Sequence, residues 1–198
     1  MALEQRKTTR WTARVGTWIR AAVWFVADIL SSFLDLKEGD SSEEKKAKTI
    51  SRALQRAVYE GADYGLVAVS ILIVSSMKAL GFSFTGAFAA LWVFDFVVAG
   101  AFVAFYEKTG KDLSLGEDFR RAVDTIHGKS KLAGYLAMSL VMAQAIYWSG
   151  PEQIVIFFRK EIGTVSRVVT ALAGLTAIQA LIWTVLYGFG YHLVTGQF

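Results

Sequence analysis

Four long apolar runs dominate the chain, and polar segments of unequal length separate them. The runs cover about residues 65–80, 86–106, 132–148 and 168–191. A helix rises about 1.5 Å per residue, so a run of about 20 residues matches the roughly 30 Å hydrocarbon core of a bilayer. The pattern predicts an all-α, polytopic integral membrane protein in which four transmembrane helices form two hairpins, together with amphipathic interfacial and cytoplasmic helices.

Residues 1–64 precede the first span and predict a basic arm followed by amphipathic helices at the cytoplasmic membrane face. Within this region, segment 15–36 is apolar enough to span. Its polar residues recur at three- and four-residue steps, however, and form one stripe along a helix: Thr17, Arg20, Asp28, Ser31 and Asp35. An interfacial helix is therefore favoured, with Trp11, Trp18 and Trp24 at headgroup depth. A fifth span that faces partner chains is the alternative.

A second amphipathic helix is expected over about 42–60. Ser41 followed by Glu44 makes a capping box, which opens this helix. One side of the helix is basic and predicts a surface that faces solvent or lipid headgroups: Lys45, Lys48, Arg52 and Arg56. Gly61 and Gly65 would then separate this helix from the first span.

Two more short helices are predicted at the membrane interface, over 114–127 and 152–163. Ser114 and Glu117 have the spacing of another capping box. The later helix follows a break at residues 149–151 and carries its large apolar residues on one side. Residues 65–198 are thus expected to form one four-helix transmembrane domain with two interfacial helices.

Composition and charge agree with a membrane protein and indicate its orientation. Of the 198 residues, 54% are hydrophobic and 19% are charged, and there is no cysteine. Lys and Arg concentrate before the first span and in the connector between the second and third spans. The positive-inside rule therefore places both termini in the cytoplasm, and a bacterial-type inner membrane is favoured over an organelle membrane. The net charge of +4 is explained by these membrane-flanking residues, so nucleic acid is not an expected partner.

A base and an acid inside the first two runs are the strongest functional clue. An ionised Asp at a helix centre costs about 2.5 to 3.5 kcal/mol on insertion scales, so Asp95 should face protein or water. Lys78 is close enough along the predicted hairpin to pair with it. Two alternatives stay open: Lys78 reaches the outer interface while Asp95 binds another subunit, or Asp95 takes part in a proton or ion relay.

Polar residues on the third and fourth spans predict an interhelical seam. They are Gln144, Thr176, Gln179, Thr184, Tyr187 and Tyr191. Such residues most often join helices by hydrogen bonds, worth about 0.6 kcal/mol each, and less often line a polar path.

Signatures of catalysis and of cofactor binding are missing from the sequence. It contains no Gly-rich phosphate loop, no Gly-x-Ser-x-Gly elbow and no His-Glu-x-x-His motif. His127 and His192 are weak candidates for metal ligands, and ordinary interfacial histidines explain them better. We therefore expect no enzyme, no metal and no cofactor.

These observations favour a non-catalytic integral subunit of a larger multiprotein membrane complex, such as secretion or energy-transducing machinery. Its expected partners are the lipid bilayer and other membrane-protein subunits, with a hetero-oligomer favoured over a homo-oligomer. The alternative is a small homo-oligomeric ion channel or transporter that uses Asp95 and Lys78.

Overall fold

The structure is a computed structural model that describes residues 23–37 and 39–195, and the regular elements in this part of the chain are all helices. Four helices are long and apolar enough to cross a membrane. They are Ser42–Ala79, Phe84–Thr109, Lys131–Ser149 and Val165–Tyr191. The prediction of an all-α chain with four candidate spans is confirmed.

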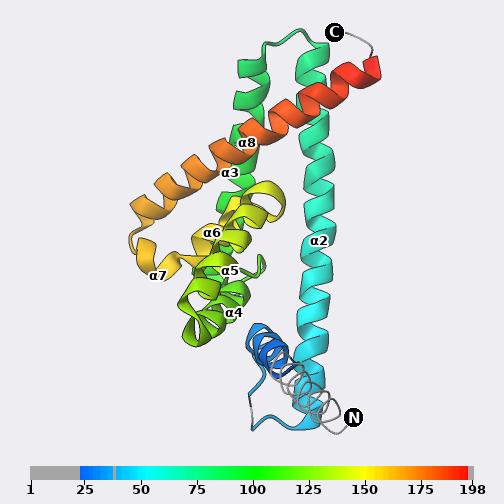
Figure 1. Ribbon diagram of the computed structural model, residues 1–198. Coiled ribbons are helices and arrows are strands. Elements are labelled where there is room, and N and C mark those ends of the chain that lie inside the picture. Colours follow the sequence, from blue (N-terminus) through cyan, green and yellow to red (C-terminus); the bar gives the residue numbers. More distant parts are fainter. Residues whose placement is uncertain (1–22, 38, 196–198) are drawn as a thin grey trace, which may run out of the picture.

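Helix α2 (Ser42–Ala79) is one continuous helix of 38 residues, drawn in cyan in Figure 1. The capping box is confirmed, because Ser41 accepts from the Glu44 N–H and Glu44 accepts from the Ser41 N–H at 2.7 Å. The expected interruption at Gly61 and Gly65 is absent. An isolated glycine costs a helix only about 1 kcal/mol, and the helix formers on both sides outweigh this cost.

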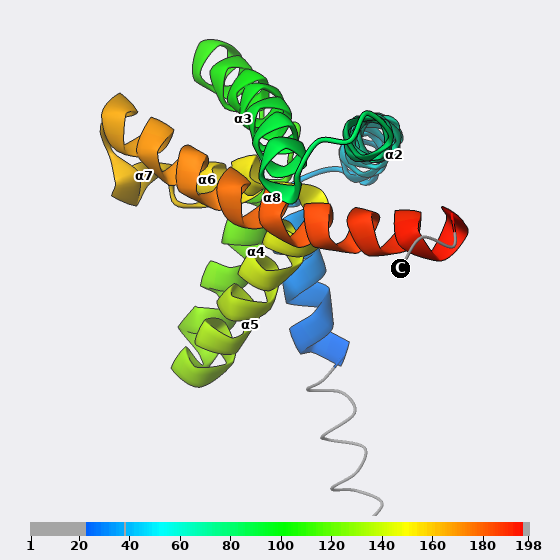
Figure 2. The ribbon, with the colours of Figure 1, turned by 90° about the horizontal axis from the view of Figure 1, so that it is seen from above.

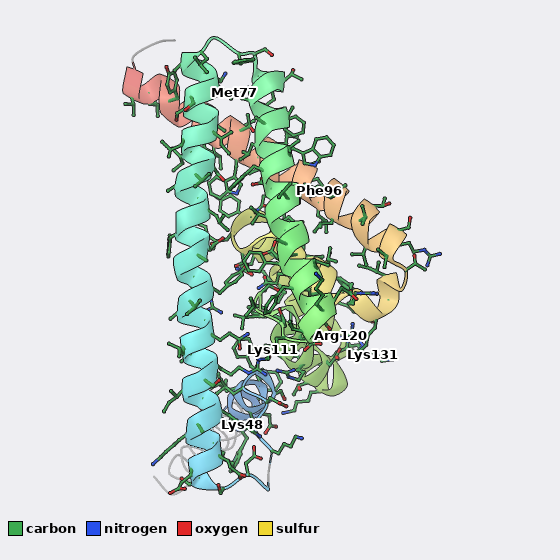
Figure 3. The ribbon with its side chains drawn as sticks, turned by 180° about the vertical axis from the view of Figure 1, so that it is seen from behind. Lys48, Met77, Phe96, Lys111, Arg120 and Lys131 are labelled. Carbon is green, nitrogen blue, oxygen red and sulfur yellow. The ribbon has the colours of Figure 1, made fainter. Side chains whose placement is uncertain are left out.

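Helix α3 (Phe84–Thr109) runs back beside α2 and completes the first predicted hairpin (Figures 1 and 3). Ser83 caps its start by accepting from the Gly86 N–H, and Gly110 ends it in the left-handed conformation, with φ 65°. Figure 3 places Met77 near the turn of this hairpin, whereas Lys48, Lys111, Arg120 and Lys131 lie toward its other end.

Helices α4 (Gly116–Lys129) and α5 (Lys131–Gln144) form a tight helical hairpin that turns at Ser130. The two helices approach closely at Gly134, where an added Cβ would lie 2.5 Å from the His127 Cβ. A π-helical turn, Ala145–Ser149, extends α5 to the end of the third candidate span.

The capping box expected at Ser114 and Glu117 is not formed. Leu115 holds the N-cap position with φ 68° and makes no side-chain cap. The Asp112 carboxylate accepts instead from the Glu117 N–H at 2.7 Å and from the Ser114 N–H at 2.8 Å. An acid one turn earlier in the loop therefore satisfies the donors that Ser114 was expected to satisfy.

The segment expected to be one amphipathic helix over 152–163 is two helices in the structure, α6 (Pro151–Phe157) and α7 (Arg159–Ile162). All seven residues of α6 are buried. Helices α3, α4 and α8 (Val165–Thr195) surround it. Burial on every side replaces the one-sided burial that the sequence pattern predicts, because three helices pack against α6.

The third and fourth candidate spans differ in direction from the first hairpin. Helix α5 packs chiefly along α4, whereas α8 packs along α3 and also contacts α2 and α6. In Figure 2 the view runs along α2, and α5 and α8 are seen lengthwise. The candidate spans are therefore not parallel within this chain, and the two-hairpin arrangement across a bilayer stays a prediction.

Two buried apolar clusters hold α3 to its neighbours. The first joins α3, α6 and α8 and contains Ala99, Val103, Val155, Ile156, Val168 and Leu172. The second joins α2, α3 and α8 and contains Val74, Leu91 and Ala180. Ala99 of the first cluster and Leu91 of the second also line the polar site described below.

An earlier helix of the N-terminal region, Val23–Phe33, contacts α4. The Phe33 and Phe119 rings meet edge to face at 5.4 Å, and Asp28 pairs with Lys129. Trp24 is 70% exposed, whereas Trp11 and Trp18 lie outside the described residues. Since residues 15–22 also lie outside them, the choice between an interfacial helix and a fifth span stays a prediction.

Candidate functional site

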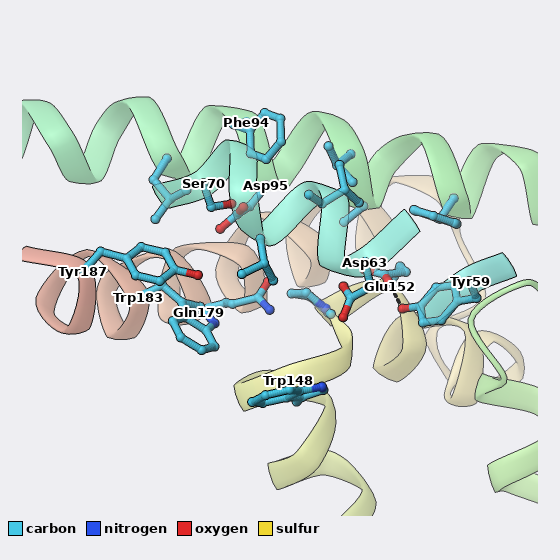
Figure 4. A pocket seen from close by; sticks show the side chains of 18 residues that line it. Tyr59, Asp63, Ser70, Phe94, Asp95, Trp148, Glu152, Gln179, Trp183 and Tyr187 are labelled. Atoms are coloured by element: carbon cyan, nitrogen blue, oxygen red, sulfur yellow. Dashed lines mark hydrogen bonds between the residues drawn. The ribbon is translucent and has the colours of Figure 1, made fainter. Parts of the chain in front are cut away.

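A small acidic cavity lies where α2, α3, α6 and α8 meet (Figure 4). Its volume is about 60 Å³. Three carboxyl groups line it, from Asp63, Asp95 and Glu152, and its lining contains no Lys, Arg or His. The remaining polar lining comes from Tyr59, Ser70, Trp148, Gln179, Trp183 and Tyr187. A site of this composition attracts protons or cations and repels anions.

Helix α2 presents one face to this cavity. Tyr59, Asp63 and Ser70 follow one another at four and seven residues, which places them on the same side of a helix. This face exists because α2 continues through Gly61 and Gly65. If the helix ended there, Tyr59 and Asp63 would belong to a different element from Ser70.

Glu152 is the most enclosed acid of the site, with 5% of its surface exposed. The Tyr59 hydroxyl donates to its Oε1 at 2.8 Å and also to the Ser149 carbonyl. Burial raises the pKa of the Glu152 carboxyl, because a charge is costly to remove from water, and the Tyr59 hydrogen bond opposes this rise.

Gly150 is required for the position of Glu152. Its φ is 102°, a conformation that residues with a side chain rarely adopt, and Pro151 follows as the first residue of α6. An added Cβ at Gly150 would lie 2.5 Å from both carboxylate oxygens of Glu152. The single proline of the chain therefore begins a helix whose second residue folds back over a glycine.

Asp95 of α3 and Gln179 of α8 also line the cavity. In Figure 4 the Asp95 carboxylate points toward α8, where Gln179 and Tyr187 are drawn. The hydrogen bonds and ion pairs of the described residues include none to the Asp95 or Gln179 side chain. Gln179 is nevertheless 91% buried, since only 9% of its surface is exposed.

The structure does not pair Lys78 with Asp95. No ion pair between described residues joins the two, and the Lys78 Cε lies beside Gly188 of α8, 3.8 Å from where a Cβ would be. Lys78 is also not part of the cavity lining. Lys78 thus contacts α8 near the end of α2, whereas Asp95 lines the cavity.

The six residues of the predicted polar seam have different roles in the structure. Thr176 accepts a hydrogen bond from the Trp92 indole at 3.2 Å, which links α8 to α3. Gln179 and Tyr187 line the cavity. Gln144 donates to Ser149 within its own segment, and the buried Thr184 hydroxyl has no partner among the described residues. Tyr191 lies near the end of α8.

The basic stripe on α2 is largely paired within the chain. Lys48 pairs with Asp40 at 2.6 Å and Arg56 with Glu60 at 2.7 Å. Arg52 reaches Asp118 of α4 at 3.2 Å. Lys45 is half-buried on the same side. The sequence indicates the stripe, but it does not reveal that α4 would supply an acid to it.

Asp118 is a second buried acid, 1% exposed, and it belongs to the contact between α2 and α4. Arg121 pairs with its other oxygen. Burial raises the pKa of Asp118 more than Arg52 and Arg121 lower it. Because both oxygens are paired, this acid is a structural contact between helices and has no free oxygen to offer a ligand.

The histidines do not form a metal site in the described part of the chain. The His127 ring meets the Tyr135 ring edge to face at 5.1 Å, between α4 and α5. The side chain of His192 lies outside the described residues. No group of three or more His, Asp or Glu side chains that the structure describes is placed to hold a metal ion.

Sequence reasoning identified Asp95, Gln179 and Tyr187 as candidates but missed Tyr59, Asp63 and Glu152. Two signals could have revealed the missed residues. Asp63 is one turn after Tyr59 and seven residues before Ser70, and Glu152 directly follows the only proline. Both signals can be read only with the correct helix boundaries. The glycines in α2 wrongly suggested an interruption, and the apolar pattern around α6 wrongly suggested one longer helix.

The chain was compared with protein-family models, curated proteins and solved structures, and none of them matches it.

Proposed function

We propose that this chain is a non-catalytic integral membrane subunit of a larger multiprotein membrane complex. The observation that carries the proposal is an apolar stripe on α2. Ile50, Leu54 and Val58 are spaced by four residues and are 67%, 64% and 67% exposed. Residues four apart lie on the same face of a helix, so the three side chains form one continuous strip.

Lipid does not explain this stripe. At about 1.5 Å per residue, the 38 residues of α2 are about 57 Å long, whereas the hydrocarbon core is roughly 30 Å thick. The apolar half of α2 is the C-terminal half, so the half with the stripe extends beyond the hydrocarbon. A continuous helix that crosses the bilayer cannot also lie flat on its surface. An exposed apolar strip of this kind is typical of a surface for another protein chain.

The candidate spans also leave most of their surface to other molecules. In the most apolar window of each span, 17%, 17%, 17% and 33% is buried inside the chain. The divergence of α5 and α8 from α2 leaves faces that lipid and other membrane subunits would cover (Figure 2). We expect partners of a different sequence, in a bacterial-type inner membrane, with both termini cytoplasmic.

The acidic cavity favours ion-coupled, energy-transducing machinery over secretion machinery. Carboxyl groups placed between spans mark ion or proton sites in membrane proteins. The cavity has three carboxyl groups and no basic lining residue. A role in handling charge is therefore the function of a subunit that this site supports best.

A homo-oligomeric ion channel or transporter is the second candidate. The observation in its favour is Asp95, which lines the cavity and has no partner among the described residues. Lys78 is not needed for it, because this lysine lies outside the cavity. Other copies of this chain would then line the rest of the ion pathway.

Native purification in a mild detergent, followed by identification of every associated chain, tests the proposal. Leu54→Asp should release the partner chains, because it places a charge in the centre of the stripe. Thr49→Asp is the matched control, since Thr49 is also exposed on α2 but lies on a different face. Stoichiometric different chains that Leu54→Asp removes and Thr49→Asp retains support the proposal.

A closed ring of this chain alone would favour the channel or transporter instead. A chain that purifies alone as a monomer, or partners that both variants retain equally, would reject the subunit role of this stripe.

A further inference from the structure

The acidic cavity contains polar groups whose hydrogen-bonding capacity the protein itself does not use. Asp95 makes no hydrogen bond or ion pair with a described residue. Glu152, in contrast, accepts from Tyr59 and is also stabilised by its own backbone N–H. Buried acceptors without a donor are costly, so groups of this kind are normally completed by water or by a bound ion.

Gln179 adds an independent observation that points to a ligand. Its side chain is 91% buried, lines the cavity, and has no partner among the described residues. Its amide atoms are not among the fully enclosed, unpaired atoms of the described residues, so the amide is open to the cavity, where it can meet water or an ion. Leucine at this position would fill similar space but would offer no oxygen, so an amide here indicates a polar ligand.

The size of the cavity restricts what this ligand can be. Its volume of about 60 Å³ holds a few water molecules, since one water needs about 10–15 Å³ on the same measure. Pockets for organic ligands enclose roughly 300–1,000 Å³. Organic cations and peptides are therefore too large, and a small inorganic ion with water fits.

The charge and placement of the carboxyl groups decide which ion. Apart from two tyrosines, the ionisable groups of the lining are three carboxylic acids, so the ion is a cation. Among the described residues, no three acids are placed closely enough to hold a metal ion between them, which disfavours a divalent ion held directly by the protein. A singly charged cation needs less opposing charge, and water can supply part of its ligands.

We propose that this cavity binds one small monovalent inorganic cation, Na⁺ or K⁺, through the Asp95 carboxylate, the Gln179 side-chain oxygen and water. Asp63 and Glu152 add negative charge around the ion. This inference deepens the ion-coupled role proposed above, but it concerns the isolated chain and does not need partner subunits.

Equilibrium binding of radioactive sodium, and its competition by potassium, tests the site on the purified full chain in detergent. Choline chloride keeps the ionic strength constant, because choline is too large for the cavity. We expect about one sodium ion per chain. The thermal unfolding midpoint should also rise by a few degrees for each tenfold increase in sodium or potassium above the dissociation constant.

Two variants remove the proposed ligands and one serves as a control. Asp95→Asn and Gln179→Leu should each weaken cation binding at least about tenfold, because a ligand oxygen or its charge is lost. Asp124→Asn is the matched control, since the Asp124 side chain is 67% exposed on α4 and lies outside the cavity. It should bind sodium as the original chain does.

A purely structural role for Asp95 predicts a different result. In choline, Asp95→Asn should be at least as stable as the original chain, because a neutral amide is easier to bury than a carboxylate without a partner. Only its response to sodium or potassium should disappear. The proposal would be overturned if the unfolding midpoint were the same in sodium, potassium and choline, or if potassium did not compete with radioactive sodium. It would also be overturned if both cavity variants kept their response to sodium or potassium.

The chain can purify without partner chains and still bind sodium. It can also purify with partner chains and bind no sodium. The two proposals are therefore separable.

Discussion

Tyr59 connects three segments through a single hydroxyl. It lies on α2, donates to the Ser149 carbonyl at the end of the π-helical turn, and donates to Glu152 at the start of α6. Its ring meets Phe102 of α3 edge to face at 5.6 Å. Glu152 can be buried at this position because a donor from another helix is directed at it.

Tyr59→Phe keeps the ring and removes this donor. We expect a loss of about 1–3 kcal/mol of stability, because a buried carboxyl and a buried carbonyl both lose their partner. Thermal unfolding in detergent measures it. Tyr64→Phe is the control, since Tyr64 is on the same helix and 61% exposed. Equal effects of the two substitutions would mean that the Tyr59 hydroxyl does not stabilise the fold.

The contact between Arg52 and Asp118 gives a pH dependence of known sign. Burial raises the folded-state pKa of Asp118. As the pH rises and Asp118 ionises, its buried charge therefore lowers the stability of the fold. Arg52→Ala removes one of its two cations and should destabilise the chain by about 1–3 kcal/mol at neutral pH. This deficit should shrink as the pH falls, because protonated Asp118 needs no cation.

Unfolding midpoints measured from neutral to acidic pH test this expectation. Arg56→Ala is the control, because Arg56 pairs with Glu60 on the same exposed helix face, where ion pairs contribute about 0–1 kcal/mol. A deficit of Arg52→Ala that is constant with pH would show that the loss comes from packing and not from the charge of Asp118.

At the scale of the element, hydrophobic periodicity predicted the helices well and their boundaries less well. The four candidate spans and the Ser41 capping box follow from local patterns, because helix formation depends on neighbours within a few residues. The continuity of α2 and the full burial of α6 depend on tertiary packing. Local sequence does not specify that packing, so both were missed.

Two glycines should respond to alanine with opposite signs. Gly61 lies inside α2 and nothing approaches an added Cβ within 4 Å, so Gly61→Ala should stabilise the chain by up to about 1 kcal/mol. At Gly116 an added Cβ would lie 2.6 Å from the backbone oxygen of Gln153, so Gly116→Ala should separate α4 from α6. We expect a loss of about 1–3 kcal/mol there.

Unfolding midpoints and helix content by circular dichroism measure both variants. If α2 were interrupted near Gly61, alanine at this position would give no gain or a loss. A neutral Gly116→Ala would contradict the close approach of α4 to α6.

At the scale of the whole molecule, the site assembles residues from four helices that are distant in sequence. Asp95 and Gln179 were recognisable because polar groups are rare inside apolar runs. Their meeting with Tyr59 and Glu152 was not, because one sequence does not reveal which helix faces pack together. The predicted partner of Asp95 was a lysine nearby along the hairpin, whereas in the structure Asp95 shares the cavity with polar residues of α2, α6 and α8 (Figure 4).

Orientation in the membrane is the remaining property of the whole molecule, and the absence of cysteine makes it testable. Lys48, Lys111 and Lys131 lie at one end of the first hairpin in Figure 3, and the positive-inside rule predicts that this end is cytoplasmic.

In spheroplasts, a membrane-impermeant maleimide should label Ser83→Cys in the hairpin turn directly. Lys46→Cys and Lys111→Cys should react only after permeabilisation, and Leu72→Cys should resist labelling because lipid covers this exposed position of α2. Labelling of Lys46→Cys before Ser83→Cys would reverse the orientation, and ready labelling of Leu72→Cys would mean that α2 does not cross the bilayer there.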